Sequence, residues 1–170
     1  RQEWRRSHHL RGEGIFARDE GSDLLSRRSP RRRERTLAFQ SLFMLDVGQV
    51  TEQDALDYIS EATPEPELQL WTAERVRGTW GQRVDLDTTI QAHLQNWQWD
   101  RVGRVERSLM RLAAYEMLHC HDLTFSAAIS EAVDLAKEYG DAKSAPFVNG
   151  VLDSVWRSRA PEESAQSEAG

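Results

Sequence analysis

Residues 124–155 read TFSAAISEAVDLAKEYGDAKSAPFVNGVLDSV and contain the most regular helical pattern of the chain. Within them, apolar residues recur at positions i, i+3, i+4 and i+7, which is the spacing of one face of an α-helix: Ile129, Ala132, Val133 and Ala136. Thr124 is typical of a residue that starts a helix, and Gly140 of one that ends it. We therefore expect a helix over 124–139 and a second one that opens at Ser144 and ends at Pro161.

The same periodicity predicts five further helices upstream. They are expected over about 31–47, 52–62, 67–84, 85–97 and 101–119, the last of them capped by Asp100. Glu116 falls on the apolar face of the 101–119 helix, where a buried carboxylate needs a partner. No segment of useful length alternates as a β-strand does, so the predicted fold class is all-α, with seven helices joined by short loops.

Length and composition narrow the function classes. The chain has 170 residues, 39% apolar and 29% charged, which fits one domain or two very small ones. No run approaches the roughly 18 apolar residues of a membrane span, and the N-terminus lacks the apolar core of a secretory signal. The single Cys120 excludes an internal disulfide and fits a reducing cytoplasm.

Charge is distributed unevenly. Residues 1–35 hold 11 basic and 6 acidic residues, a net +5, whereas residues 36–170 hold 11 basic and 22 acidic residues, a net −11. All the basic residues of the first segment are arginines, which bind phosphates and stack on bases. An anionic partner such as nucleic acid is one interpretation, and a solubilising tail from an arginine-preferring genome is the other. We predict a disordered basic extension over 1–29, a helical domain over 30–159 and a disordered acidic tail over 160–170.

Signatures of catalysis are missing from the sequence. It has no phosphate-binding loop, no dinucleotide fingerprint and no nucleophile elbow, so we expect neither an enzyme nor a cofactor. His119, Cys120 and His121 form the one metal-like cluster. Because consecutive residues point to different faces of a helix, they would not converge on one ion, and no metal site is expected.

Two segments could bind an anionic strand. The run Arg31-Arg32-Arg33-Glu34-Arg35 lies on the first turns of a predicted helix, where phosphates would relieve the repulsion between the arginines and the helix dipole. Residues 140–150 lead into a helix N-terminus, whose free N–H groups attract anions. There Lys143 adds charge and Phe147 could stack on an unpaired base, although it could instead be the first core residue of the last helix. Gly150 would be explained by a close helix–helix contact.

Residues 125–153, FSAAISEAVDLAKEYGDAKSAPFVNGVLD, resemble the C-terminal signature of the NusB family of bacterial transcription antitermination factors. Residues 31–45 resemble the opening helix of that family and residues 105–118 its central helix, so the resemblance covers about 30–157. It implies two small helical bundles packed together and no enzymatic activity. It also implies binding to boxA, a short single-stranded RNA element of ribosomal RNA leaders, together with NusE (ribosomal protein S-ten), in an antitermination complex with RNA polymerase.

The resemblance also implies where the contacts lie. The RNA-binding residues would be Arg31, Arg32, Arg33, Arg35, Phe43, Lys143, Ser144, Phe147 and Asn149. Phe43 stands where family members often have tyrosine, so ring stacking is kept and a hydroxyl hydrogen bond is lost. Glu106 and its helix would contact NusE. Residues 1–29 have no family counterpart.

Two alternatives remain open from the sequence. One is an RNA-binding domain related to those of ribosomal RNA cytosine methyltransferases, without the catalytic part; the short polar stretch after the last helix leaves no room for a cofactor-binding domain. The other is an interaction protein that has lost RNA binding and covers its arginines in a homodimer. The basic arm argues against complete loss, but a homodimer of the free protein stays open.

Overall fold

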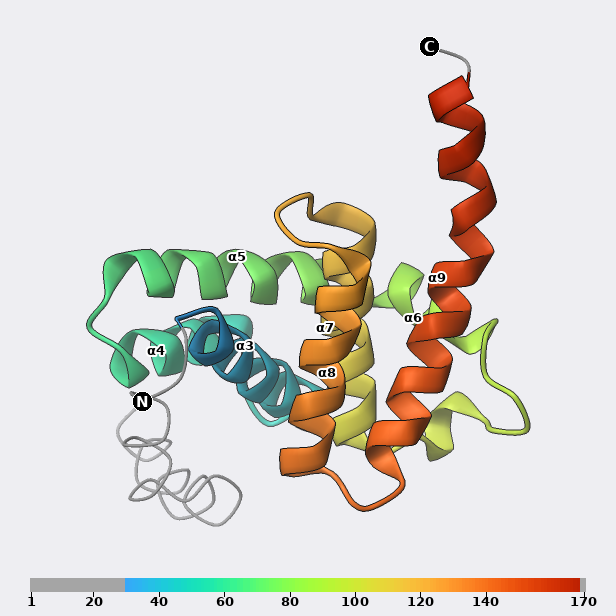
Figure 1. The fold of residues 1–170 in the computed structure, drawn as a ribbon. Helices are drawn as coiled ribbons and strands as arrows, with labels where there is room; N and C mark the ends of the chain where they lie inside the picture. Colours follow the sequence, from blue (N-terminus) through green and yellow to red (C-terminus); the bar gives the residue numbers. More distant parts are fainter. Residues whose placement is uncertain (1–29, 169–170) are drawn as a thin grey trace. The chain divides into compact units, whose positions relative to one another are not determined.

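The computed structural model describes residues 30–168, and it describes side chains for residues 31–159. Residues 30–168 form seven α-helices and one short 3-10 helix, which are joined by loops. The helices are α3 (Pro30–Val47), α4 (Glu52–Ala62), α5 (Pro66–Gly81), α6 (Arg83–Gln91), the 3-10 helix η1 (Trp99–Arg101), α7 (Arg104–His119), α8 (Phe125–Tyr139) and α9 (Ser144–Glu168) (Figure 1). The described residues contain no strand, and the all-α prediction with seven helices is confirmed. The predicted extension over 1–29 lies outside the described residues.

The boundary between the two units of the chain falls inside α3. Residues 1–33 form the first unit and residues 34–170 the second, so the first turn of α3 belongs to the first unit and the rest of the helix to the second. None of the described helices combines the length and the apolar character that crossing a bilayer requires.

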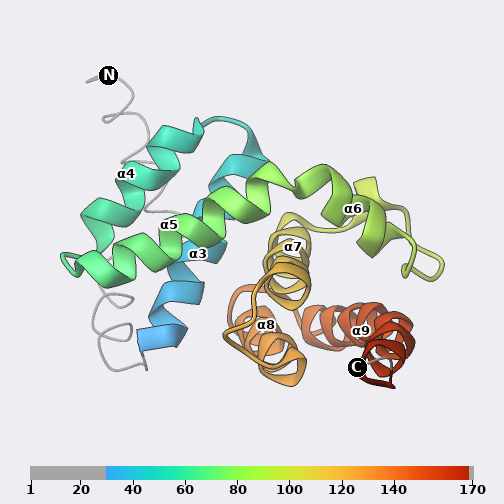
Figure 2. The same cartoon turned by 90° about the horizontal axis from the view of Figure 1, so that it is seen from above.

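The last three long helices, α7, α8 and α9, form one packed group in which each contacts the other two (Figure 2). Of the periodic apolar residues noted in the sequence, Ala132 and Ala136 are buried, whereas Ile129 and Val133 are half-buried. The core also includes the fully buried side chains of Leu109, Leu135, Val148 and Leu152. Helix α6 packs against α7 and α9 at its edge. Burying such side chains stabilises the fold by about 1.5–3 kcal/mol each.

A second group of helices consists of α3, α4 and α5. Gln40 of α3 links it to its neighbours, because its Oε1 accepts a hydrogen bond from Tyr58 Oη of α4 at 2.8 Å and its Nε2 donates to Tyr139 Oη of α8 at 3.4 Å. The ring of Phe39 lies 5.0 Å from that of Tyr139. Helix α5 contacts α7, so the two groups pack on each other as the predicted pair of small bundles.

Four predicted helix ends are wrong, and the first is that of α5, which ends at Gly81 instead of about residue 84. Helix α6 ends at Gln91 instead of near residue 97. Asn96, farther along the loop, adopts a left-handed backbone (φ 61°), so a helix could not have continued through it to residue 97. Helix α7 begins after Gly103 instead of Asp100, since Asp100 belongs to η1. Helix α9 continues to Glu168, past Pro161. A proline removes a single N–H donor, and the residues that follow it include good helix formers.

Candidate nucleic-acid interface

The arginine-rich run begins at the N-terminus of α3. Pro30 occupies the start of the helix, where its missing N–H would have no partner in any case. Arg31 is exposed, and Arg32 and Arg33 are half-buried. Three cations on this turn are unfavourable against the helix dipole, so an anion bound to them would stabilise the helix start.

Arg35 does not share this exposure. Its side chain belongs to the core, with 4% of the residue's surface exposed. Its Nε donates to Glu116 Oε2 at 3.2 Å, and its guanidinium lies 5.5 Å from the ring centroid of Trp71. Arg35 Nε is thus paired with a buried carboxylate, and direct contact of Arg35 with RNA stays a prediction.

Glu116 is the buried carboxylate that the sequence predicted to need a partner, and it has two. Besides Arg35, Arg75 of α5 donates from Nε to Glu116 Oε1 at 3.4 Å. Arg75 also binds both oxygens of Asp122 at 2.7 Å and lies 4.2 Å from the ring centroid of Trp71. Burial raises the pKa of Glu116, and the two guanidinium groups oppose that rise. This cluster ties α3, α5 and α7 together.

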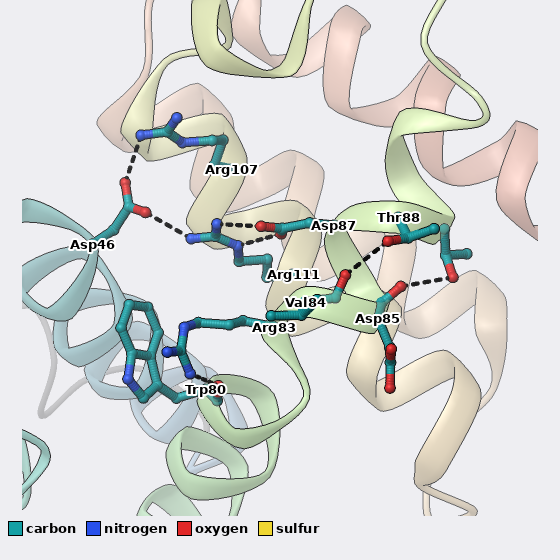
Figure 3. A network of polar contacts seen from close by, with 10 residues as sticks. Asp46, Trp80, Arg83, Val84, Asp85, Asp87, Thr88, Arg107 and Arg111 are labelled. Atoms are coloured by element: carbon teal, nitrogen blue, oxygen red, sulfur yellow. Dashed lines mark hydrogen bonds and ion pairs between the residues drawn. The ribbon is translucent and has the colours of Figure 1, made fainter.

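A second polar network holds the C-terminal end of α3 (Figure 3). Asp46 accepts hydrogen bonds from Arg107 Nη2 at 2.8 Å and from Arg111 Nη1 at 2.7 Å, and Arg111 also binds both oxygens of Asp87 at 2.6 and 2.7 Å. Burial alone would raise the pKa of Asp46, but the hydrogen bonds and charges of Arg111 and Arg107 outweigh it and hold that pKa below its usual value. The network joins α3 to α6 and α7.

The turn before α9 is closed by its own side chains. Asp141 Oδ1 accepts from the backbone N–H of Lys143 at 2.7 Å, and Ser144 Oγ accepts from the backbone N–H of Asp141 at 2.9 Å. These two bonds cap the helix reciprocally. Since a carboxylate already occupies this helix start, the expectation of free N–H groups awaiting a phosphate is wrong.

The Ser144 hydroxyl is engaged within the chain, and its contact with RNA stays a prediction. Ser144 is 2% exposed, and its hydroxyl donates to Glu106 Oε1 on the first turn of α7. The physical reason is the cap itself, which turns the side chain inward. Ser144 and Glu106 therefore fix the start of α9 to the start of α7. Glu106 remains half-exposed, and its contact with NusE stays a prediction.

The other expected contact residues of α9 lie at the surface. Lys143 and Asn149 are exposed, and Phe147 is half-exposed, so it is not simply a core residue. Gly150 is exposed as well, and a Cβ added there would have no atom within 4 Å, so no helix–helix contact explains this glycine. Phe43 of α3 is half-exposed, with its ring 6.3 Å from that of Phe39.

One residue beside Phe147 escaped the sequence analysis. Trp97, in the loop after α6, is 57% exposed and meets the Phe147 ring edge-on at 6.2 Å between centroids. Trp97 lies near several other tryptophans in the sequence, and the residue type alone does not show which of them is exposed. Other tryptophans of this region pack on arginines. Trp99, for example, lies 5.4 Å from the Arg111 guanidinium.

Metal ligands do not gather among the described side chains, where no group of three or more His, Cys, Asp or Glu residues is placed to hold an ion. His119, Cys120 and His121 instead line an open hollow of about 680 Å³ with Arg75 and Tyr115 among its other walls. Burial raises the pKa of the Cys120 thiol, which makes it a poorer nucleophile at neutral pH.

An all-helical fold with an arginine-rich helix start and an exposed lysine and aromatic surface is typical of a helical nucleic-acid-binding protein. A family model described as the NusB family matches residues 32–157 of this chain. The chain belongs to the NusB family.

Curated relatives agree with this assignment. The transcription antitermination protein NusB of Desulfatibacillum aliphaticivorans is 39% identical over 137 residues, which cover 80% of this chain and 96% of the relative. NusB of Bacillus subtilis is 38% identical over 125 residues, which cover 74% of this chain and 93% of the relative.

Solved structures show the same fold. NusB of T. maritima superposes with a TM-score of 0.71 at 31% identity, covering 82% of this chain and 99% of that one. A NusB solved with NusE and double-stranded RNA superposes with a TM-score of 0.69 at 27% identity, covering 76% of this chain and 97% of that one.

Proposed function

We propose that this chain is a transcription antitermination factor. It binds boxA-type single-stranded RNA of ribosomal RNA leaders as a heterodimer with NusE, and the pair helps RNA polymerase to read through terminators. The observation that carries this proposal is the family match over residues 32–157, joined to the structural likeness to a NusB solved with NusE and RNA.

The proposed RNA contacts divide by chemistry. Arg31, Arg32 and Arg33 bind phosphates, which gives affinity that falls with salt. The rings of Phe43 and Phe147 stack on unpaired bases.

Other side chains complete this scheme. The Lys143 ammonium adds a phosphate contact, and the amide of Asn149 hydrogen-bonds a base edge. Arg35 and Ser144 act from the core as positioning residues, because their polar groups already bind other parts of the chain.

The net negative charge of residues 36–170 also supports binding to a basic protein partner. Residues 36–170 carry a net −11, and this acidic surface attracts a basic ribosomal protein and accelerates the encounter at low salt. Glu106 on the first turn of α7 is the proposed contact with NusE. The proposed role requires no covalent step, so it is not that of an enzyme, and it is carried out where transcription occurs, in the bacterial cytoplasm.

The test is fluorescence anisotropy of a labelled boxA-like RNA titrated with the full chain. It is done with and without NusE, at two salt concentrations, and against a scrambled strand of the same composition. We expect binding that prefers the boxA-like strand and tightens strongly with NusE. Equal binding to both strands that disappears at high salt would reduce the chain to a non-specific polycation and would refute the proposal.

A further inference from the structure

The loop between α6 and η1 lies along the N-terminal half of α9 (Figure 1). His93 Nδ1 is 2.9 Å from Ser154 Oγ, and four residues later Trp97 meets Phe147, about two helical turns earlier on α9. The loop is therefore fixed at both ends against α9. Asn96, with its left-handed backbone, turns the chain immediately before Trp97.

Trp97 is one of three large apolar side chains that are exposed among the described residues. More than half of its surface is exposed, and its ring meets that of Phe147 at an interplanar angle of 63° instead of stacking on it in parallel. An exposed tryptophan ring is well suited to stack on another flat ring.

A cation and an uncovered backbone flank the two rings. Lys143 is exposed in the turn before α9, four residues before Phe147, and Gly150 is exposed nearly one turn after Phe147 on α9. No other atom lies within 4 Å of the position that a Cβ on Gly150 would take. A glycine inside a helix is unfavourable relative to alanine, and one use of it is to let a ligand approach the backbone closely.

We propose that Trp97 is a second stacking platform for unpaired RNA, continuous with Phe147, and that the strand passes over Gly150 with a phosphate near Lys143. Trp97 also forms a wall of a hollow of about 420 Å³, with Gln91, Leu94, Gln98, Trp99 and Asp100. Amide and carboxylate groups hydrogen-bond the edges of bases, and the negative charge of Asp100 repels phosphate. The hollow therefore receives a base instead of the backbone.

This inference rests on the proposed function, since it adds a residue and a base to the same RNA interface. It differs from it in the residue tested, because Trp97 is not among the RNA-binding residues expected from the resemblance. The two can therefore fail separately.

The experiment compares Trp97→Ala, Trp97→Phe and the full wild-type chain in the presence of NusE, with labelled boxA-like RNA and the scrambled strand. Losing one stacked base weakens binding by about 5- to 100-fold, so we expect a loss in that range for Trp97→Ala. Trp97→Phe keeps a ring and should recover most of the affinity. Leu70→Ala is the matched control, because Leu70 of α5 is 59% exposed and is not part of this surface.

Two readouts separate stacking from a structural effect. Trp97→Ala should leave the slope of log affinity against log salt unchanged, whereas Lys143→Ala should reduce that slope by about 0.7. RNA should also quench the part of the intrinsic fluorescence that Trp97→Phe removes.

Each other outcome overturns the inference. Trp97 is not in the interface, while the proposed function stands, if Trp97→Ala binds RNA as the wild type does. The same holds if RNA does not quench the part of the wild-type fluorescence that Trp97→Phe removes. If Trp97→Ala loses NusE and keeps RNA, the surface belongs to a protein partner. If the wild type itself has no preference for the boxA-like strand, both proposals fail.

Discussion

Arg31 and Arg35 are the same residue type four positions apart, and they have different roles. Arg31 is exposed on the first turn of α3, whereas Arg35 is buried against Glu116. Composition and spacing do not distinguish the two residues, since both belong to one arginine run. What distinguishes them is that the apolar face of the helix, from Leu37 onward, begins directly after Arg35.

The first prediction separates these arginines. Arg35→Ala should lower the free energy of unfolding by about 2–4 kcal/mol, because it leaves Glu116 with one buried partner, Arg75. Arg31→Ala should change stability by no more than about 0.5 kcal/mol and reduce the salt slope of RNA binding by about 0.7. Urea unfolding and salt-dependent anisotropy measure the two quantities.

Glu116→Gln is the control for the buried pair. It should destabilise the chain at least as much as Arg35→Ala, since it removes the charge that faces both Arg35 and Arg75. An Arg35→Ala protein that is as stable as the wild type and has lost RNA binding would place Arg35 in the interface.

The lowered pKa of Asp46 predicts that the free energy of unfolding depends on pH in the acid range. Asp46 has a lower pKa in the folded chain than the ordinary value of about 3.9, so its stabilising effect is complete above that value and is lost as pH falls through the folded pKa. Asp46→Asn should cost about 2 kcal/mol at pH 7 and show a shallower loss of stability between about pH 5 and pH 2. Circular dichroism during urea unfolding at several pH values checks this.

The exposed Asp57 supplies the comparison for that experiment. Asp57→Asn should leave both the stability and its pH dependence close to those of the wild type. If the Asp46→Asn and wild-type curves stay parallel down to pH 2, Asp46 does not carry the effect.

At the scale of elements, the helices could be predicted better than their ends. The regular spacing in 124–139 gave α8 within a residue, because apolar period, Thr124 cap and Gly140 agree. The region before α7 could not be predicted in the same way, since Asp100 is as suitable for η1 as for a helix cap. The cap formed by Asp141 and Ser144 was missed because its hydrogen bonds depend on a turn geometry that residue types do not specify.

Two glycines in helix interiors give a matched prediction. Gly150→Ala should stabilise the chain by about 0.5–1 kcal/mol, because the new methyl group meets open space. Gly78→Ala should destabilise it by about 1–3 kcal/mol, because its Cβ would overlap the ring of Tyr115 on α7. Thermal unfolding of both variants tests the difference in sign.

The two results can be read independently of each other. A stabilised Gly150→Ala protein with weaker RNA binding would measure how closely the strand approaches α9. A stabilised Gly78→Ala protein would mean that Tyr115 moves aside without cost, and the close approach of α5 to α7 would then have no energetic role.

At the scale of the whole molecule, the distribution of net charge can be predicted most directly from the sequence. A net +5 over residues 1–35 and a net −11 over residues 36–170 can be counted without a structure. The surroundings of the candidate residues were less predictable, because Arg35 and Ser144 turn out to be buried and Trp97 to be exposed. These surroundings depend on contacts between residues as far apart as Arg35 and Glu116, which local patterns do not contain.

Deleting residues 1–29 tests the role of the basic extension. The deletion removes 7 arginines and 5 acidic residues and should weaken binding to boxA-like and scrambled RNA by a similar factor. The ratio of the two affinities should not change, because phosphate contacts carry no sequence information. Anisotropy titrations of both strands measure that ratio, and a ratio that falls toward one would place sequence recognition in the extension.

The pairing of Arg35 with Glu116 also sets an order of events during synthesis. The two residues are 81 positions apart, and at about 5–20 residues per second the ribosome needs about 4–16 s to add the second after the first. The two residues become available to each other only after α7 has emerged. Until then α3 can pack on α4, through contacts such as that of Gln40 with Tyr58, but Arg35 lacks the carboxylate that pairs with it.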